Sequence, residues 1–289
     1  MKKRSQVLET VVHGVFLLLG LITVGCVLLI SVYLIVSGIP AIRKIGLVPF
    51  LFGKTWASTA AEPSYGILPF ILTSVYGTAG AIVLGVPLGF LTAVYLAKVA
   101  PPRLKTVLES AVSLLAGIPS VVYGLVGMLV LVPGIRKMFH LADGASLLAA
   151  IVVLAIMILP TIIGVVEPAL RAVPTSDYEG ALALGATHER SVYTAVVPAA
   201  KSGILAGIVL GVGRAMGETM AVIMVAGNQP RMPKGILQGV RTLTGNIVIE
   251  MGYATGLHRE ALIATGVVLF VFILLINLCF SALKRGKKA

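Results

Sequence analysis

Six long apolar stretches decide what this chain can fold into. Each is roughly 20 residues or longer and almost free of charge, the length that a helix needs to cross about 30 Å of hydrocarbon. Lipid offers the backbone no hydrogen-bond partner, and the alternating ten-residue strands of a membrane barrel are absent, so the spans must be helices. We predict an all-α polytopic membrane protein with transmembrane helices at 14–36, 69–97, 108–132, 146–167, 203–227 and 261–283.

The composition and the charge pattern exclude several other classes of protein. Hydrophobic residues make up 58% of the chain and charged residues 12%, which is more apolar surface than a soluble domain of 289 residues needs. The formal net charge of +12 would suit nucleic acid, but the basic residues lie at the ends of the spans, in clusters such as MKKR and LKRGKK, so no nucleic-acid partner is expected. Cys26 and Cys279 each stand alone in a span, which supports neither a disulfide nor a zinc site.

The distribution of basic residues predicts that both termini are cytoplasmic. An even number of spans puts the two ends on one side, and the positive-inside rule weights short loops most, such as the loop with Lys98, Arg103 and Lys105. A secretory signal peptide is the alternative for the first span. The apolar run there is longer than a signal core and has no convincing cleavage site, so we expect a retained helix. We divide the chain into an N-terminal helix with an extracytoplasmic loop (1–68), a transmembrane domain (69–283) and a basic cytoplasmic tail (284–289).

The cytoplasmic connection at 168–202 is predicted to form two short surface helices. Ser176 and Glu179 fit a capping box at the start of the first helix. Gly185 is placed to end that helix, and Thr187 is placed to cap the second. Such a pair of helices either packs on its own bundle or docks on another protein. The residues on one face of the first helix are Tyr178, Ala181, Leu182 and Gly185.

The same connection carries a recognisable motif. Glu179, Gly180, Ala181 and Gly185, with Pro198 further on, have the spacing of the EAA motif. In this respect the chain resembles the permeases of ABC importers, although Gly180 replaces the first alanine. The resemblance implies a type I (MetI-like) permease fold in which this loop is a coupling helix that fits a cleft on an ATPase subunit. ATP and Mg²⁺ would then be bound by that partner, and this chain would bind no cofactor or metal and hold no catalytic residue.

The fifth span carries two charges, Arg214 and Glu218, inside an apolar stretch. An arginine at the centre of a membrane helix costs about 2.5–3.5 kcal/mol on insertion scales, so it needs a compensating role. The i,i+4 spacing predicts that the two side chains share a helix face and form an ion pair. The pair either fixes helix packing or belongs to a pathway, because a guanidinium donates two hydrogen bonds to an oxyanion at once. In the second case Glu218 accepts the proton of hydrogen phosphate, or it neutralises Arg214 until the cargo competes for it.

Small residues and prolines are expected to shape the bundle. GxxxG spacings in the fifth span let another helix approach closely. Prolines inside spans are expected to kink their helices. The glycines are Gly203, Gly207, Gly211, Gly213 and Gly217, and the prolines are Pro87, Pro119 and Pro160.

Five segments spread over the chain match a single branch of the ABC importer permeases. They are GIPA (38–41), FLFGKTW (50–56), GILPFI (66–71), AGIPSVVYGL (116–125) and GRAMGETMAV (213–222). These segments resemble the PstC-type permease subunit of phosphate importers. The resemblance implies a subunit of an ATP-driven phosphate importer of the inner (cytoplasmic) membrane, with Arg214 and Glu218 on the phosphate pathway. The implied partners are a homologous permease of the PstA type, two ATPase subunits of the PstB type and an extracytoplasmic phosphate-binding protein of the PstS type.

Other functions stay open from the residues alone. A permease for another oxyanion would use the same arginine. An ion-coupled secondary transporter would also place charges at mid-membrane, but it would not need the EAA-like loop. A non-transporting scaffold has no use for an arginine within a span. A nucleotide site on this chain is not expected, because Val48 stands where a phosphate-binding loop around Gly53-Lys54-Thr55 needs its first glycine.

Overall fold

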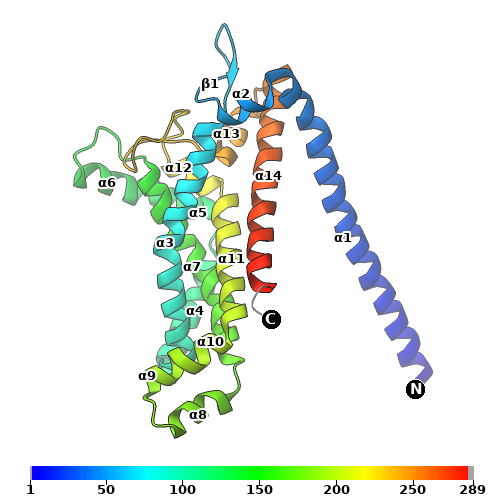
Figure 1. Cartoon of the computed structure of the whole chain (residues 1–289), viewed down its shortest axis with the longest axis vertical. Helices are drawn as coiled ribbons and strands as arrows, with labels where there is room; N and C mark the ends of the chain where they lie inside the picture. The colour runs from blue at the N-terminus through cyan, green and yellow to red at the C-terminus, as the bar shows by residue number, and fades with distance from the viewer. Residues whose placement is uncertain (1, 286–289) are drawn as a thin grey trace.

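The computed structural model describes residues 2–285, which are almost entirely helical. Figure 1 shows a bundle of near-vertical helices and one long helix, α1, that leans away from it. The last four residues of the predicted basic tail lie outside the described residues. The long helices are α1 (Lys2–Ile45), α3 (Leu68–Lys98), α7 (Leu147–Arg171), α11 (Lys201–Gly217) and α14 (Gly256–Arg285).

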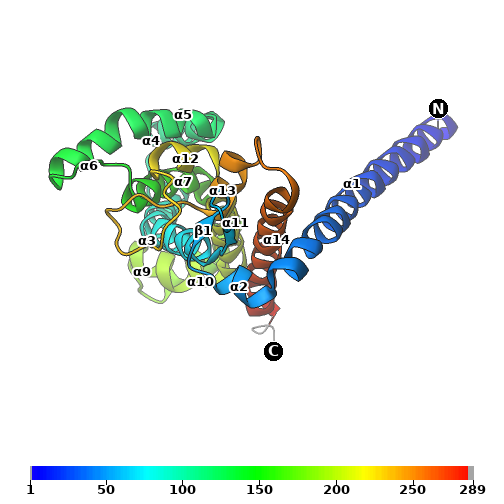
Figure 2. The same ribbon diagram turned by 90° about the horizontal axis from the view of Figure 1, so that it is seen from above.

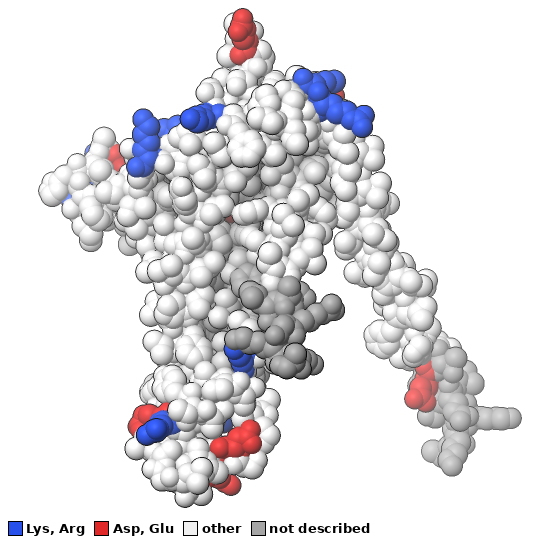
Figure 3. All heavy atoms as spheres, in the orientation of Figure 1, with Lys and Arg blue, Asp and Glu red and all other residues white. Residues whose placement is uncertain are grey.

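The number and character of the spans agree with a polytopic membrane protein. Among the described residues, five helices are long and apolar enough to cross a membrane, or six if two bent helices are counted as one broken span. The predicted spans at 69–97 and 146–167 agree with α3 and α7 to within a few residues, and those at 14–36 and 261–283 lie inside the longer α1 and α14. Charged side chains gather at the two ends of the bundle and leave its middle almost bare (Figure 3).

The predicted span at 108–132 is wrong as a single helix. The helix stops before Pro119 and starts again after it. The reason is that a proline disfavours the helical conformation of the residue before it, and Ile118 is extended, with ψ 126°. The resulting segments are α4 (Pro102–Gly117), α5 (Ser120–Val126), a π-helical turn η1 (Gly127–Leu131) and α6 (Val132–Met138).

The predicted span at 203–227 is also interrupted. The helix α11 ends at Gly217, Glu218 is extended with ψ 129°, and α12 (Met220–Val225) begins after Thr219. At its other end, α11 meets the preceding short helices at a bend of 74°. A break of this kind at membrane depth is tolerated where it is buried in protein or lines a water-filled path.

The helices α3 and α7 pack closely because glycines on α3 face isoleucines on α7. A Cβ atom added to Gly85 would lie 2.6 Å from Cδ1 of Ile158, so only glycine allows this approach. Both helices continue without a break through Pro87 and Pro160. Of the three prolines that we expected to kink a helix, only Pro119 interrupts one.

The glycine stripe of α11 is confirmed in its first half. A Cβ atom on Gly203 would lie 2.3 Å from the Cβ of Ala169, and Gly207 and Gly211 likewise face α7. In the part of the chain that the structure describes, nothing lies within 4 Å of the corresponding positions on Gly213 and Gly217. The end of α11 that carries Arg214 is therefore more open than its beginning.

A small cap closes the upper end of the bundle. A two-stranded hairpin projects there (Figure 1), with Trp56 opposite Tyr65. The Trp56 ring packs edge-on against Tyr65 and Phe70, with ring centroids 5.5 and 5.6 Å apart. The elements of the cap are α2 (Leu47–Phe52), β1 (Trp56–Ala57), β2 (Ser64–Tyr65) and α13 (Leu243–Glu250).

Short helices form the opposite end of the bundle, at the bottom of Figure 1. They belong to the connection that the sequence predicts to be cytoplasmic. Seen from above in Figure 2, α1 and α6 extend from opposite sides of the bundle. The short elements are α8 (Thr175–Ala183), α9 (His188–Ser191), a second π-helical turn η2 (Val192–Val196) and α10 (Val197–Ala199).

Candidate functional site

Arg214 and Glu218 do not form the predicted ion pair in the described structure. Arg214 is exposed in the last turn of α11, and Glu218 is the first residue beyond the helix end. Since the extended backbone at Glu218 takes its side chain off the helix face, the i,i+4 geometry no longer applies. The Glu218 carboxylate instead accepts a hydrogen bond of 3.2 Å from the N–H of Ala221, one of the unpaired donors at the start of α12.

The helix α12, which follows the break after α11, packs against α5, which follows the break after α4. Gly124 makes this contact possible, because a Cβ atom there would lie 2.8 Å from Cα of Ala221. The Tyr123 hydroxyl donates a 2.7 Å hydrogen bond to the Leu115 carbonyl, across the break between α4 and α5. Tyr123 also lies within electrostatic range of Arg214. The arginine therefore stands where two interrupted spans meet, an arrangement that builds substrate sites in membrane transporters.

The Arg214 guanidinium is available for an external anion. The ion pairs among the described residues involve other cations, namely Lys44, Arg171, Arg241 and His258. An exposed guanidinium keeps its planar set of donors for a ligand of matching geometry, such as a carboxylate or a phosphate.

The predicted end of the first surface helix is confirmed in detail. Gly185 has φ +84°, a left-handed conformation that L side chains rarely adopt. Its N–H bonds to the Leu182 carbonyl at 2.9 Å, and the next N–H, of Ala186, bonds to the Ala181 carbonyl at 3.2 Å. These two bonds make a Schellman motif, the usual way in which a glycine ends a helix.

The predicted start of the first surface helix, α8, is wrong, whereas the predicted start of the second, α9, is right. The helix α8 begins at Thr175 after Pro174 and has no side-chain cap, so Ser176 and Glu179 do not form a capping box. A proline before the first turn already fixes an extended entry, and Ser176 falls inside the helix. Thr187 caps α9, and its hydroxyl accepts a 3.3 Å bond from the backbone N–H three residues later.

The residues of the EAA-like motif lie on the outer surface of these helices. Glu179, Gly180 and Gly185 are exposed, and Ala181 is half-buried. Leu184, which the sequence did not single out, is 91% exposed at the same helix end. Its apolar side chain therefore projects from the same tip as Gly185.

A hydrogen bond fixes the angle between the two surface helices. The Tyr178 hydroxyl lies 2.7 Å from Nδ1 of His188, and the two rings meet edge to face. Tyr178 also packs against the main hydrophobic core. The predicted apolar face of α8 thus turns inward at Tyr178, while the tip around Gly185 points away from the bundle.

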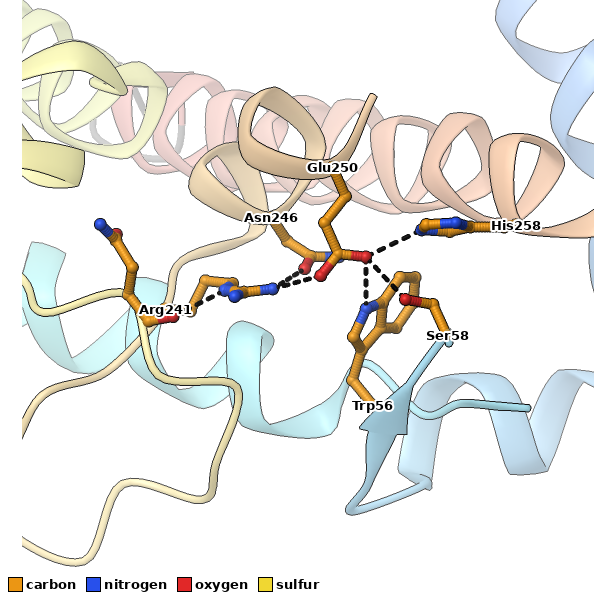
Figure 4. Close-up of polar contacts among 7 residues, drawn as sticks. Trp56, Ser58, Arg241, Asn246, Glu250 and His258 are labelled. Carbon is orange, nitrogen blue, oxygen red and sulfur yellow. Dashed lines mark hydrogen bonds and ion pairs between the residues drawn. The ribbon is translucent and has the colours of Figure 1, made fainter. Parts of the chain in front are cut away.

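A buried carboxylate organises the cap at the opposite end of the bundle (Figure 4). Glu250 is 5% exposed and accepts hydrogen bonds from four side chains. Two donors come from the hairpin region, one from the loop before α13 and one from the start of α14. They are Trp56 Nε1 at 2.9 Å, Ser58 Oγ at 3.0 Å, Arg241 Nη1 at 2.5 Å and His258 Nε2 at 2.8 Å.

The donors around Glu250 keep it ionised. Burial alone raises the pKa of the Glu250 carboxyl, but the hydrogen bonds from Trp56, Arg241, His258 and Ser58 outweigh this effect and hold the pKa below its ordinary value. Arg241 also donates to Asn246 at 2.9 Å and to the Asn228 carbonyl at 2.9 Å. The cluster ties separate parts of the cap together through one charge.

No periodic pattern in the sequence predicts this cluster. Trp56 and Glu250 are 194 residues apart, and both lie in stretches that we predicted as connections between spans. A glutamate within the apolar run NIVIE was the one available hint, since such a residue needs a buried partner.

A second ion cluster lies near the end of the bundle that carries the short helices α8, α9 and α10. Arg171, the last residue of α7, contacts both Glu167 on α7 and Glu109 on α4. Arg171 thereby connects α4, the first segment of the interrupted third span, to the end of α7, just before the surface helices. The sequence did not predict this cluster either.

Comparison with known proteins agrees with this geometry. Residues 85–288 match the family described as binding-protein-dependent transport system inner membrane component. The probable ABC transporter permease protein YqgH of Bacillus subtilis is 39% identical over 266 residues, which cover 89% of this chain and 86% of that protein. The phosphate transport system permease protein PstC of Xylella fastidiosa is 35% identical over 243 residues, which cover 78% of this chain and 74% of that protein.

The fold also resembles solved structures. A chain of the MetNI methionine ABC transporter in an inward-facing conformation superposes with a TM-score of 0.56 at 23% identity, covering 76% of this chain and 94% of that chain. The likeness spans the central helices and supports the predicted MetI-like arrangement.

Proposed function

The chain belongs to the family of inner membrane components of binding-protein-dependent transport systems, and we propose that phosphate is the cargo that it carries. It is a permease subunit of an ATP-binding-cassette importer and not an enzyme. Membership of this family excludes the ion-coupled transporter and the scaffold as alternatives. A relative that is named a phosphate permease supports the choice of cargo.

The observation that carries the proposal is the exposed guanidinium of Arg214 at the meeting point of two broken spans. A phosphate oxygen pair matches the two parallel donors of an arginine. Glu218, which accepts the bond from Ala221, holds the first turn of α12 and thereby the bend beside Arg214. We assign both residues to the pathway, Arg214 as the anion ligand and Glu218 as the residue that fixes the break.

The same arginine defines the face that a partner must cover. An uncompensated charge at mid-membrane costs about 2.5–3.5 kcal/mol on insertion scales, so lipid is a poor neighbour for Arg214. A homologous permease of the PstA type would shield this face and close a water-filled path around it. The pathway then lies between the two permeases.

The surface helices at the other end would dock on the ATPase. We propose that two ATPase subunits of the PstB type bind ATP and Mg²⁺, and that one of them receives the tip formed by Leu184 and Gly185. Closure of the ATPases would move α8, and the rigid Tyr178–His188 contact would pass that movement to the bundle. This chain itself would bind no cofactor.

The extracytoplasmic end is suited to receive an anion. Lys and Arg side chains gather along the upper surface in Figure 3. A basic rim raises the local concentration of phosphate at the mouth of the path. A phosphate-binding protein of the PstS type would deliver the cargo there. The exposed basic residues of this end include Arg43, Lys44, Lys54, Arg231 and Lys234.

Uptake of labelled phosphate by the reconstituted complex tests the proposal. We expect ATP-dependent uptake that excess unlabelled phosphate suppresses and excess sulfate does not. Uptake suppressed by sulfate as strongly as by phosphate would assign the chain to a broader oxyanion importer. ATP-dependent import of neither anion would refute the proposed cargo.

Single-cysteine labelling tests the orientation. We expect a cysteine at Gly180 to react with an impermeant thiol reagent only in opened cells, and a cysteine at Ser58 to react in intact cells, because the positive-inside bias puts both termini and α8 in the cytoplasm. The variants carry Cys26→Ser and Cys279→Ser, which remove the two native thiols. Reaction of position 180 but not position 58 in intact cells would reverse the topology.

Replacement of Gly185 tests the docking tip. We expect Gly185→Glu to insert in the membrane but to lose both ATPase co-purification and phosphate uptake, because a charged side chain must then be desolvated in the cleft. The left-handed backbone adds about 1–2 kcal/mol of strain for any L residue. Gly185→Ala is the matched control for this strain, because it meets the same left-handed backbone without adding a charge. Normal uptake by Gly185→Glu at normal expression would show that the ATPase docks elsewhere.

A further inference from the structure

A small cavity with a mixed polar and apolar wall lies behind the break that presents Arg214. Its volume is about 10 Å³, which is room for a single water molecule. It is enclosed by α3, α7, the end of α11 and the residues around the start of α13. The polar residues in its wall are Thr73, Ser74, Thr78, Glu218, Thr242 and Thr244.

One hydroxyl in the cavity wall has no partner. Thr73 is fully buried, and its Oγ1 makes no hydrogen bond in the described structure. Threonines in helices usually bond back to the carbonyl four residues earlier, as Thr92 does on the same helix at 2.7 Å and Thr265 does on α14 at 2.9 Å. Thr73 does not make this bond. An unpaired buried hydroxyl beside a cavity indicates a missing hydrogen-bond partner in that cavity.

Most of the other polar groups in the wall are already engaged. Ser74 accepts a 3.1 Å bond from the Leu243 N–H, and Thr242 accepts one of 3.1 Å from Gly245. Thr244 donates to the backbone carbonyl of Glu218 at 3.3 Å. These bonds hold the loop before α13 against the break.

The Glu218 carboxylate has acceptor capacity to spare. Its Oε1 accepts one bond, from Ala221, while a carboxylate offers about four acceptor positions. Thr73 offers a donor, and Glu218 offers acceptors on the wall of the same one-water space. A water molecule matches both, because it accepts from one group and donates to the other.

We propose that this cavity binds one buried water molecule that accepts a hydrogen bond from Thr73 and donates one to Glu218. The water connects α3 to the break between α11 and α12, so Thr73 is a positioning residue for the pathway. Its effect on transport rests on the proposed function, whereas its effect on stability does not.

Thr73→Val tests the proposal by the sign of its effect on thermal stability in the assembled transporter. Valine has nearly the same shape and lacks the hydroxyl. If the water is present, the variant loses a satisfied hydrogen bond and strands the water, and the melting temperature falls by about 2–4 °C. If the cavity is empty, the variant removes an unpaired buried hydroxyl, and the melting temperature stays the same or rises. The second result would overturn the proposal.

Two further variants separate positioning from general damage. Thr73→Ser keeps the hydroxyl, so we expect it to retain the parent melting temperature and maximal uptake rate. Thr92→Val is the control on the same helix, since its hydroxyl bonds to its own backbone away from the cavity. We expect Thr73→Val, and not Thr92→Val, to show a several-fold loss in the maximal rate of phosphate uptake at unchanged KM. Equal losses in both valine variants would contradict a specific role of Thr73. If Thr73→Val lowers the melting temperature but the parent imports no phosphate, the water site stays supported and only the proposed cargo is refuted.

Discussion

Arg214→Gln is expected to abolish phosphate uptake while the chain still inserts and assembles. A hydrogen bond to a charged group contributes about 1.5–3 kcal/mol, and the guanidinium donates two to a phosphate. Uptake should therefore fall by about two orders of magnitude or more. Because Arg214 makes no ion pair in the described structure, its removal leaves no carboxylate unpaired, and stability should stay the same or rise.

A matched control separates the role of Arg214 from net charge. Lys234→Gln removes one positive charge from an exposed loop at the cap end of the bundle. We expect this variant to transport nearly as well as the parent, with at most a modest loss at low phosphate concentration. The measurement is labelled-phosphate uptake, normalised to the amount of assembled complex. Uptake by Arg214→Gln at the level of Lys234→Gln would remove Arg214 from the pathway.

The geometry also predicts how Arg214 and Glu218 combine. A glutamine at position 218 keeps an acceptor for the Ala221 N–H but loses the charge, so we expect Glu218→Gln to impair uptake less than Arg214→Gln does. The double variant should remain inactive, because no buried ion pair is there to be neutralised. Recovery of uptake in the double variant would mean that the two side chains do pair in another state of the transport cycle.

The spans that the sequence predicts well are those that depend on apolar length alone. The helices α3 and α7 are continuous and agree with the predictions at 69–97 and 146–167. The two interrupted spans could not be predicted equally well. Pro119 marks the first break in the sequence, but the second break has no proline, and its extended residue, Glu218, is held by contacts from Thr244 on a distant part of the chain. Tertiary contacts fix that break, so a periodic pattern cannot reveal it.

The surface helices show the same division between local and tertiary causes. Gly185 and Thr187 act within one helical turn, and both predicted roles are confirmed. The capping box failed because the helix starts directly after Pro174, two residues earlier than a box capped by Ser176 requires. Arg214 and Glu218 were proposed for the pathway from their chemistry, since charges within a span are rare. The ion pair predicted between them was wrong because the helix ends at Gly217, between the two residues.

The second large effect is expected at the cap, where Glu250→Gln should destabilise the protein strongly. The variant keeps the size of the side chain but leaves the Arg241 guanidinium, which is 11% exposed, without a counter-ion. It also turns an NH₂ group toward donors such as Trp56 Nε1, which were bonded to a carboxylate oxygen. Breaking a buried pair in this way costs about 3–5 kcal/mol. Glu260→Gln is the matched control, because the exposed Lys44–Glu260 pair at 3.0 Å contributes at most about 1 kcal/mol.

The pH dependence of the cap follows from the same carboxylate. Since the pKa of Glu250 is lowered in the folded protein, its contribution to stability is fully present above the ordinary pKa of a glutamate, about 4.3, and is lost as the pH falls through the lowered value. The parent cap should therefore weaken only in acid, while Glu250→Gln is weak at every pH. Trp56, the single tryptophan of the chain, donates directly to Glu250, so its fluorescence during thermal unfolding of the purified chain reports on this site. A melting temperature of Glu250→Gln as high as that of Glu260→Gln at neutral pH would show that the cap does not depend on this charge.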